Sequence, residues 1–368
     1  MTSVVREAFL TLLRMGLWHN SQEDLSVFPL QAEEWSLVME VAKAQTVEGI
    51  VYEGILLLPE QYYPPQALLM SWVARIDSIE RNNNKLSEAL YILTKGFRQE
   101  GIDFMLLKGL GLGNNYIKPS VRVGGDLDLY FASEEDFHKA NSLVASKGIR
   151  VKKGDHNSRI YLFRKVEVEH HTKMIDIFNP FVQERLAVLM EEEGGKRRSF
   201  RIKDVEVQTP SFVMAHVQAS SHILKHYMGF GVGLRQFCDV ARLSITQPDE
   251  REAQKLREIY KQLGLERWMR LMYSFLVLKL GLPKEFSPYT ETEEKSTEKL
   301  LEDILHSGNF GFHDIRYRKG EVKRSERYSK RDAVFKRIMP HLVFLLRIVP
   351  QEVFWYPLYK AYTKVFAR

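Results

Sequence analysis

Residues 106–131 of the chain read LLKGLGLGNNYIKPSVRVGGDLDLYF. Near the end of this stretch, Asp126 and Asp128 alternate with leucines, which is typical of a β-strand. Because side chains i and i+2 of a strand point to the same side, the two carboxylates are predicted to stand next to each other on a sheet. Adjacent carboxylates repel each other unless a proton or a cation lies between them. The stretch therefore predicts a cation-binding site.

The chemistry of this acidic pair favours magnesium. Carboxylate oxygens are hard ligands, and Mg²⁺ usually shares its coordination shell with substrate phosphates. A Mg²⁺ ion held by two carboxylates draws charge away from the α-phosphorus of a nucleoside triphosphate and aligns the phosphates. We therefore interpret Asp126 and Asp128 as ligands of one or two Mg²⁺ ions in a phosphoryl or nucleotidyl transfer site.

Residues 166–171, VEVEHH, supply candidates for a third acidic ligand. Strand alternation places Glu167, Glu169 and His171 on one face. Glu169 is the preferred third carboxylate, as a metal ligand or as a general base, with His171 beside it in the pocket. Asp176, on the next predicted strand, is a weaker candidate.

Four residues near the acidic pair are candidates for contacts with the triphosphate. Lys108 and Gly109 end the first predicted strand. Glycine lets a backbone approach a phosphate closely, a helix start offers free N–H groups, and the lysine adds a positive charge. Arg122 and Gly125 are predicted to lie beside the carboxylates.

Each of these features also has a purely structural interpretation. Asp-x-Asp pairs arise by chance in a chain with 47 acidic residues. The two glycines before Asp126 can form only a turn, and Lys108 can lie in solvent at the end of a strand. Glu167 and Glu169 can be the solvent-exposed face of an edge strand. The metal site is favoured because all these residues fall in one compact segment.

Hydrophobic periodicity predicts an α+β fold in three parts. Residues 1–100 have helical spacing, residues 101–208 combine short strands with a helix, and residues 209–368 return to helical spacing. The last part includes a basic loop over 308–337. We expect the helical regions to flank a small mixed sheet.

Individual elements follow from the same patterns. The long helix predicted over 68–98 is expected to break or kink near Asn82–Asn84, and Ser133 is expected to cap a helix that ends at Gly148. Strands are predicted over 102–107, 127–131, 149–153, 159–163, 166–170 and 174–178, followed by a hairpin of 200–202 and 205–208.

Composition sets the cellular setting that we expect. The chain is 45% hydrophobic and 27% charged, as in ordinary globular proteins. Its one cysteine, Cys238, excludes an internal disulfide framework and cysteine-rich zinc sites. No apolar stretch reaches the roughly 20 residues of a membrane span, and residues 1–16 lack the features of a signal peptide. These features predict a cytoplasmic protein.

The net charge of +6 is concentrated in one segment. Residues 316–337 contain ten lysines or arginines and three acidic residues. Such a patch attracts RNA or an anionic membrane surface, although a solvated linker has the same composition. The aromatic residues of 354–362 are predicted to pack on the helical region, with a membrane-surface role as the minor alternative.

The helical part after residue 209 has polar residues whose role is open. His222 and His226 share a helix face and could bind a metal, but buried core histidines are the more common case. Arg235 and Asp239 are four residues apart and could pair with each other. Arg235 could instead reach a triphosphate.

Together these residues resemble a known family. The order Leu106-Leu107-Lys108-Gly109, Tyr116, Pro119, Arg122 and Asp126-Leu127-Asp128-Leu129 is similar to the uncharacterised bacterial nucleotidyltransferases of the DNA polymerase β-like superfamily. Glu169 matches the family's third acid and His171 its histidine. His216, His222 and residues 234–239 resemble its helical region. One departure is Gly109-Leu110, where the superfamily usually has two glycines or a glycine and a serine.

The resemblance implies a mixed-sheet palm, Mg²⁺ and transfer of a nucleoside monophosphate from a nucleoside triphosphate to a hydroxyl. It also implies that Arg235 helps to close the cleft, with His222 as a further candidate. A small-molecule acceptor is the default, with RNA or protein acceptors as alternatives. The departure at Gly109-Leu110 leaves open a degenerate protein that binds nucleotide without turning it over.

Overall fold

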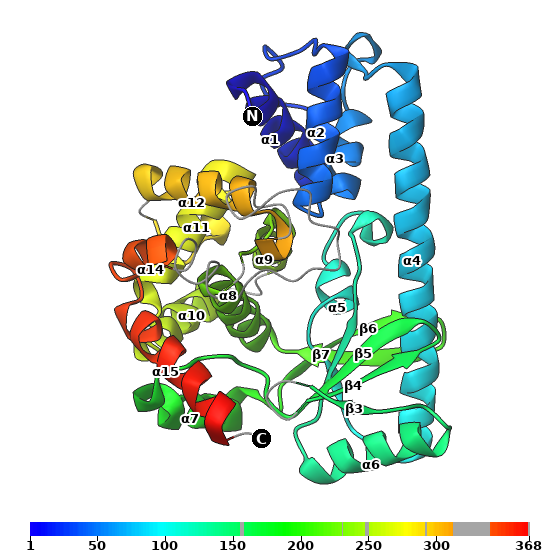
Figure 1. The fold of residues 1–368 in the computed structure, drawn as a ribbon, viewed down its shortest axis with the longest axis vertical. Coiled ribbons are helices and arrows are strands. Elements are labelled where there is room, and N and C mark those ends of the chain that lie inside the picture. Colours follow the sequence, from blue (N-terminus) through cyan, green and yellow to red (C-terminus); the bar gives the residue numbers. More distant parts are fainter. Residues whose placement is uncertain (155–157, 230, 247–249, 291–292, 312–338, 367–368) are drawn as a thin grey trace. The chain divides into compact units, whose positions relative to one another are not determined.

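The computed structural model describes residues 1–154, 158–229, 231–246, 250–290, 293–311 and 339–366 (Figure 1). The chain divides into two compact units. The first consists of residues 1–42, 47–175 and 191–218, and the second of residues 43–46, 176–190 and 219–368. The three-part division expected from periodicity stays a prediction.

The first unit begins with helices packed at close range. They are α1 (Ser3–Trp18), α2 (Ala32–Ala44), α3 (Glu48–Ile55), the short η1 (Glu60–Tyr62) and the long α4 (Gln66–Gln99). Glycines let α1 and α3 touch backbone to backbone. A Cβ atom on Gly16 would lie 1.8 Å from the Ile50 carbonyl oxygen, and one on Gly54 would lie 2.0 Å from that of Leu12.

A five-stranded mixed sheet follows. Its strands are β1 (Met105–Leu106), β2 (Leu127–Tyr130), β3 (Lys152–Lys153), β4 (Arg159–Phe163) and β5 (Val166–His171). Their order is β1-β2-β5-β4-β3, and only β2 and β5 pair in parallel. The short helices α5 (Leu110–Gly113) and η2 (Pro119–Val121) connect β1 to β2, and α6 (Glu134–Ser146) follows β2. Ser133 caps α6 by accepting a hydrogen bond from the Asp136 N–H at 3.3 Å, as predicted.

One face of the sheet packs on α4 and α6 and forms the core of this unit (Figure 1). Leu127, Leu129 and Val168 are fully buried there. His170 lies on the same face, and its Nε2 is 2.8 Å from the Tyr161 hydroxyl. Burial lowers the pKa of His170 to about 3, so the imidazole is neutral at physiological pH. Strand alternation directs the next residue, His171, to the opposite face.

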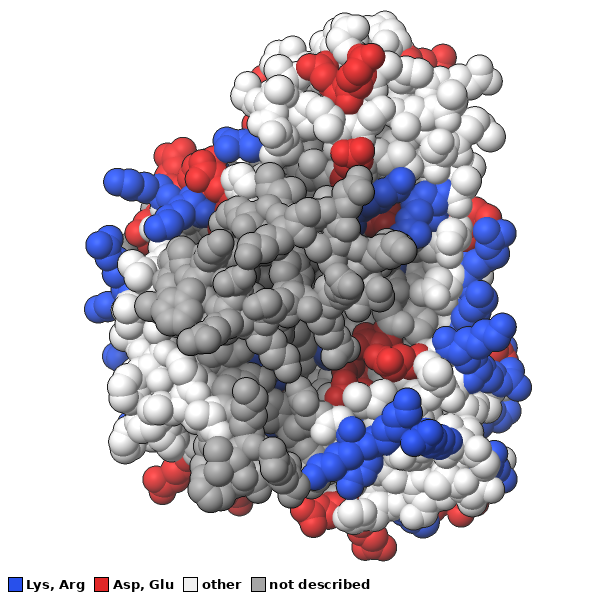
Figure 2. Space-filling view, viewed as in Figure 1, with Lys and Arg blue, Asp and Glu red and all other residues white. Residues whose placement is uncertain are grey.

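A two-stranded hairpin, β6 (Arg197–Ile202) and β7 (Val205–Pro210), completes the unit. Charged side chains join it to the exposed side of α4. Lys95 pairs with Asp204 at 3.3 Å, and Lys203 pairs with Glu88. Figure 2 shows the lysine and arginine side chains that gather over α4. Because several of them are paired with acids, this basic band is a charged, solvated helix surface.

Helix α4 continues without interruption through Asn82–Asn84, so the predicted break is wrong. The asparagines have another role. The side-chain amide of Asn83, a buried residue, donates to the carbonyls of Ser120 and Arg122 at 2.6 and 2.7 Å. Asn82 donates to the Gly124 carbonyl at 3.1 Å. These asparagines hold the segment that enters β2 against the helix, so their polarity serves a tertiary contact.

The second unit is helical. Its elements are η4 (Pro180–Val182), α7 (Gln183–Glu193), α8 (Phe212–Met228), α9 (Leu234–Ser244), α10 (Glu250–Gln262), α11 (Glu266–Leu280), η5 (Lys284–Phe286), α12 (Glu294–Ser307), η6 (Asn309–Gly311), α14 (Met339–Leu345) and α15 (Pro350–Phe366). The boundary between the two units falls within α7 and within α8. Within the described residues, none of the helices has the length and apolarity needed to cross a membrane.

The predicted α+β class is confirmed, and most of the predicted elements are present. The strand expected over 174–178 is wrong. The N–H groups of Phe178 and Asn179 donate to the buried carboxylate of Glu352, at 2.8 and 3.1 Å, and therefore do not pair with a neighbouring strand. Most of the basic loop 308–337, including all of 316–337, lies outside the described residues.

Replacing Asn83 with alanine is expected to lower the free energy of unfolding by about 2–4 kcal/mol, because two carbonyls lose their hydrogen-bond donor in a buried position. Asn82→Ala is the matched control, since it removes one donor from an exposed position. Urea unfolding of both variants checks this. Equal losses would contradict a special role for Asn83.

Candidate active site

The face of the sheet opposite the hydrophobic core brings three predicted residues together. The parallel register pairs Asp128 with Glu169, and His171 lies two residues further along β5. One ligand atom from each of Asp128, Glu169 and His171 lies within 4.8 Å of the others. No other group of three such side chains with metal-binding spacing occurs among the described residues. Residues separated by more than 40 positions therefore meet because two strands pair in parallel.

Asp128 is the buried centre of this group. Its side chain is fully buried, and its Oδ1 lies 3.1 Å from Lys108 Nζ and 3.0 Å from His171 Nε2. Burial alone would raise the pKa of the Asp128 carboxyl, but the lysine charge and the His171 hydrogen bond lower it to about 2. Asp128 is therefore ionised at neutral pH, in a place where an isolated carboxylate would be protonated.

The second oxygen of Asp128 is placed differently. Oδ2 is buried and has no hydrogen-bond partner among the residues that the structure describes. A buried, ionised oxygen without a donor is costly, and a cation would remove that cost. Glu169 Oε2 lies 3.7 Å from His171 Nε2 on the same side. Two carboxylates offer hard oxygen ligands for a divalent cation, and His171 is hydrogen-bonded to one of them, so these residues fit the predicted metal site.

Lys108 supplies positive charge at this site. Burial would lower the pKa of its ammonium, but Asp128, Asp126 and Glu169 together raise it, so the lysine is protonated. Gly109, at φ 62°, turns the chain directly after it. A Cβ on Gly109 would lie 3.2 Å from the Asp126 carbonyl oxygen. The turn after β1 therefore packs against the start of β2, and this places Lys108 beside the acids.

Ser158 is a site residue that the sequence did not reveal. This residue is 2% exposed, and its hydroxyl donates to Glu169 Oε1 at 2.6 Å. One carboxylate oxygen of Glu169 is thus held in place, and Oε2 is left toward His171. A Cβ on Gly154 would lie 2.3 Å from the Ser158 hydroxyl, so glycine at that position makes room for it. No local motif marks Ser158, because its contact depends on the pairing of β4 with β5.

The other predicted residues near β2 have different surroundings. Asp126 is partly buried and lies outside the group of three, although its charge acts on Lys108. Arg122 is buried and packs against Gly113 of α5. Gly125 is exposed, and a Cβ there would meet nothing within 4 Å. Its neighbour Gly124 has no such space, since a Cβ would lie 2.4 Å from Asn83 Oδ1. Gly124 is thus needed for packing.

The remaining candidates lie on the helices after β7. His216 is fully buried in α8, and burial lowers its pKa to about 3. The rings of His222 and His226 are 4.3 Å apart, centre to centre. Arg235 is on α9 in the second unit, and its contact with a triphosphate stays a prediction. Asp176 pairs with Lys225 at 2.8 Å, which gives this weaker candidate a structural role.

A mixed sheet with carboxylates on two neighbouring parallel strands agrees with the mixed-sheet palm that the resemblance implies. Residues 31–280 match the model of the family described as uncharacterised nucleotidyltransferase, and the chain belongs to this family. The predicted resemblance is thus confirmed. Among solved structures, the chain is similar to an antigenic nucleotidyltransferase-like protein from Paracoccidioides brasiliensis. That match has 16% identity and a TM-score of 0.35, and covers 54% of this chain and 93% of that chain. No curated protein matches the chain.

Replacing Lys108 with methionine is expected to destabilise the protein at pH 7 by about 3 kcal/mol, because it leaves the buried charge of Asp128 without its cation. The folded-state pKa of Asp128, about 2, lies below its usual value of 3.8. The stabilisation by ionised Asp128 is thus complete above pH 4 and is lost as the pH falls toward 2.

The difference between wild type and Lys108→Met should therefore shrink over that range in urea unfolding at pH 7, 4 and 3. Lys95→Met is the control, because Lys95 pairs with Asp204 on the surface, and it should change stability little. A difference that does not depend on pH would show that Lys108 acts by packing alone.

Proposed function

We propose that this nucleotidyltransferase moves a nucleoside monophosphate from a Mg²⁺-bound nucleoside triphosphate to a hydroxyl of an acceptor. The acceptor oxygen would bond to the α-phosphorus, and pyrophosphate would leave. One observation carries the proposal: Asp128, Glu169 and His171 converge within 4.8 Å, and Asp128 Oδ2 is buried without a donor among the described residues. Membership of the family supports the reaction class.

Each residue has a role that its surroundings support. Asp128 and Glu169 would hold Mg²⁺, and Asp126, the residue directly before β2, is proposed as a further ligand. When bound, Mg²⁺ would neutralise phosphate charge and favour attack at the α-phosphorus. Lys108 keeps Asp128 ionised and adds positive charge for the triphosphate. His171 orients the Asp128 carboxylate through its 3.0 Å contact.

The proton of the acceptor hydroxyl needs a base, and Glu169 is the candidate for that role as the alternative to binding the metal. Ser158 occupies Oε1 of Glu169 at 2.6 Å, so Oε2 is the oxygen available for a metal or a proton. Gly109, Arg122, Gly125 and Arg235 are proposed to contact the triphosphate. A small-molecule acceptor remains the default, and a cytoplasmic setting stays a prediction.

The direct test is a calorimetric titration of a nucleoside triphosphate with Mg²⁺. Asp128→Asn and Glu169→Gln are each expected to weaken the Mg²⁺-dependent part of binding by more than about 100-fold, because each removes a direct ligand. Asp126→Asn is expected to act in the same direction. Glu167→Gln is the matched control, since it removes an exposed carboxylate from the same strand face outside the group. Equal affinity in wild type and Asp128→Asn would refute the proposal.

Ser158→Ala is expected to raise the Mg²⁺ concentration for half-maximal nucleotide binding about tenfold, because Glu169 loses the hydrogen bond that orients it. Binding without Mg²⁺ should stay unchanged, which separates this role from a general loss of structure. Ser146→Ala, whose hydroxyl bonds only within α6, is a control. Identical Mg²⁺ titrations for Ser158→Ala and wild type would rule out the positioning role.

A second candidate function is nucleotide binding without turnover. It is supported by Gly109-Leu110 and by the ion pair that neutralises Asp128 through Lys108. Pyrophosphate release with any of a panel of hydroxyl acceptors would exclude it. An RNA-directed enzyme is the third alternative, and its predicted footprint, residues 316–337, lies outside the described residues.

A further inference from the structure

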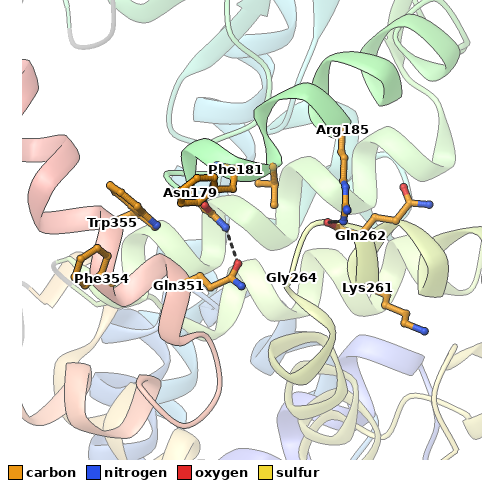
Figure 3. A pocket seen from close by; sticks show the side chains of 10 residues that line it. Asn179, Phe181, Arg185, Lys261, Gln262, Gly264, Gln351, Phe354 and Trp355 are labelled. Carbon is orange, nitrogen blue, oxygen red and sulfur yellow. Dashed lines mark hydrogen bonds between the residues drawn. The ribbon is translucent and has the colours of Figure 1, made fainter.

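The second unit contains a cavity of about 520 Å³ that the proposed transfer chemistry does not use (Figure 3). Its walls come from three places: the η4–α7 segment, the junction of α10 and α11, and the start of α15. The lining residues are Asn179, Phe181, Val182, Arg185, Lys261, Gln262, Gly264, Gln351, Phe354 and Trp355. Cavities of several hundred Å³ are typical of small-molecule sites.

One side of the cavity is aromatic. Phe181 is 79% exposed and Phe354 is 62% exposed, although such side chains are usually covered. Trp355 lies between them, with ring centres 5.7 Å from Phe181 and 5.0 Å from Phe354. Both contacts are edge-to-face. Because Phe181 and Phe354 are largely exposed, ring surface is available for a planar ligand to contact.

The opposite side is cationic. Arg185 and Lys261 are exposed there, and the Arg185 guanidinium is fixed by donating to the Gln262 carbonyl at 3.0 Å. Figure 3 shows Arg185 and Gln262 together across the cavity from Trp355. The described residues that line the cavity include no aspartate or glutamate. The charge therefore favours an anionic group.

Buried hydrogen bonds connect the segments that frame the cavity. Asn179 is 2% exposed, and its amide donates to Gln351 Oε1 at 2.5 Å. The buried Glu352 carboxylate accepts from the N–H groups of Phe178 and Asn179, which ties α15 to the segment that carries Phe181. Gly264, at φ 71°, makes room for the side chain of Gln351, because a Cβ at position 264 would lie 2.9 Å from Gln351 Oε1. These buried hydrogen bonds thus hold the segments that carry the aromatic residues next to each other.

We propose that this cavity binds a planar aromatic ring system that carries a phosphate, as in a nucleoside monophosphate or one nucleotide of a single strand. The ring stacks on Phe181 and Trp355, and the phosphate binds Arg185. The site shares no residue with the Asp128 group, and the proposed binding does not require Mg²⁺. It would give the protein a second nucleotide-type ligand, independent of the proposed transfer reaction.

The test is calorimetric binding to the full chain in EDTA, in wild type and in Asp128→Asn, so that Mg²⁺-dependent binding at Asp128 does not contribute. The probes are a nucleoside monophosphate, the nucleoside, inorganic phosphate and a short single-stranded oligonucleotide. The nucleoside and inorganic phosphate are each expected to bind at least about tenfold more weakly than the monophosphate, because each lacks one half of the ligand.

Phe181→Ala and Arg185→Gln are each expected to weaken monophosphate binding about tenfold, a size typical of a lost stacking or phosphate contact. Val188→Ala is the matched control, since Val188 is an exposed residue of α7 that does not line the cavity. Circular dichroism checks that each variant is folded. An oligonucleotide that binds more tightly than the monophosphate, with the same dependence on Phe181, would support the site and assign its ligand to a strand.

Three results would overturn the proposal. The first is that inorganic phosphate or the nucleoside binds as tightly as the monophosphate. The second is that Phe181→Ala and Arg185→Gln both bind like wild type, and the third is that neither the monophosphate nor the oligonucleotide binds. Because the titrations contain EDTA and include Asp128→Asn, failure here would leave the proposed transfer reaction untouched. Failure of the Mg²⁺ titration would likewise leave this site untouched.

Discussion

The parallel pairing of β2 with β5 is the constraint on which the site depends. It puts Asp128 opposite Glu169 in the middle of a sheet whose other face is the hydrophobic core. A fully buried carboxylate is tolerated there because one of its oxygens pairs with the Lys108 ammonium and is hydrogen-bonded to His171. Two other features of the first unit support this arrangement. Asn83 fixes the entry to β2, and the turn at Gly109 brings the lysine to the acids.

Strand alternation separates the functions of neighbouring residues. His170 and His171 are adjacent in sequence, yet one is buried, neutral and bonded to Tyr161 while the other contacts Asp128. Val166 and Val168 line the core on the side of His170, and Glu167 and Glu169 face away from it. A shift of one residue in the register of β5 would bury two carboxylates and expose two valines. The packing of the core therefore protects the geometry of the site.

The sequence predicted the site residues that stand in recognisable local patterns. It missed Ser158, which no local pattern marks. Asp128, Glu169 and His171 were found because alternation and the family pattern agree. Ser158 was missed because its partner is set by the pairing of β4 with β5, which no short motif records. The expected break at Asn82–Asn84 and the expected strand at 174–178 failed for a related reason. In both places polar groups bond to distant parts of the chain, and local propensity could not show this.

The two oxygens of Asp128 suggest how one carboxylate can serve two cations. Lys108 and His171 both contact Oδ1, which leaves Oδ2 buried and without a donor among the described residues. A lysine bound to both oxygens would block a metal, whereas an acid with no lysine would be protonated in so buried a place. The observed arrangement avoids both outcomes. It keeps the acid charged without a metal, and it leaves one oxygen without a contact to the lysine. The proposed cation would therefore meet a carboxylate that is already ionised.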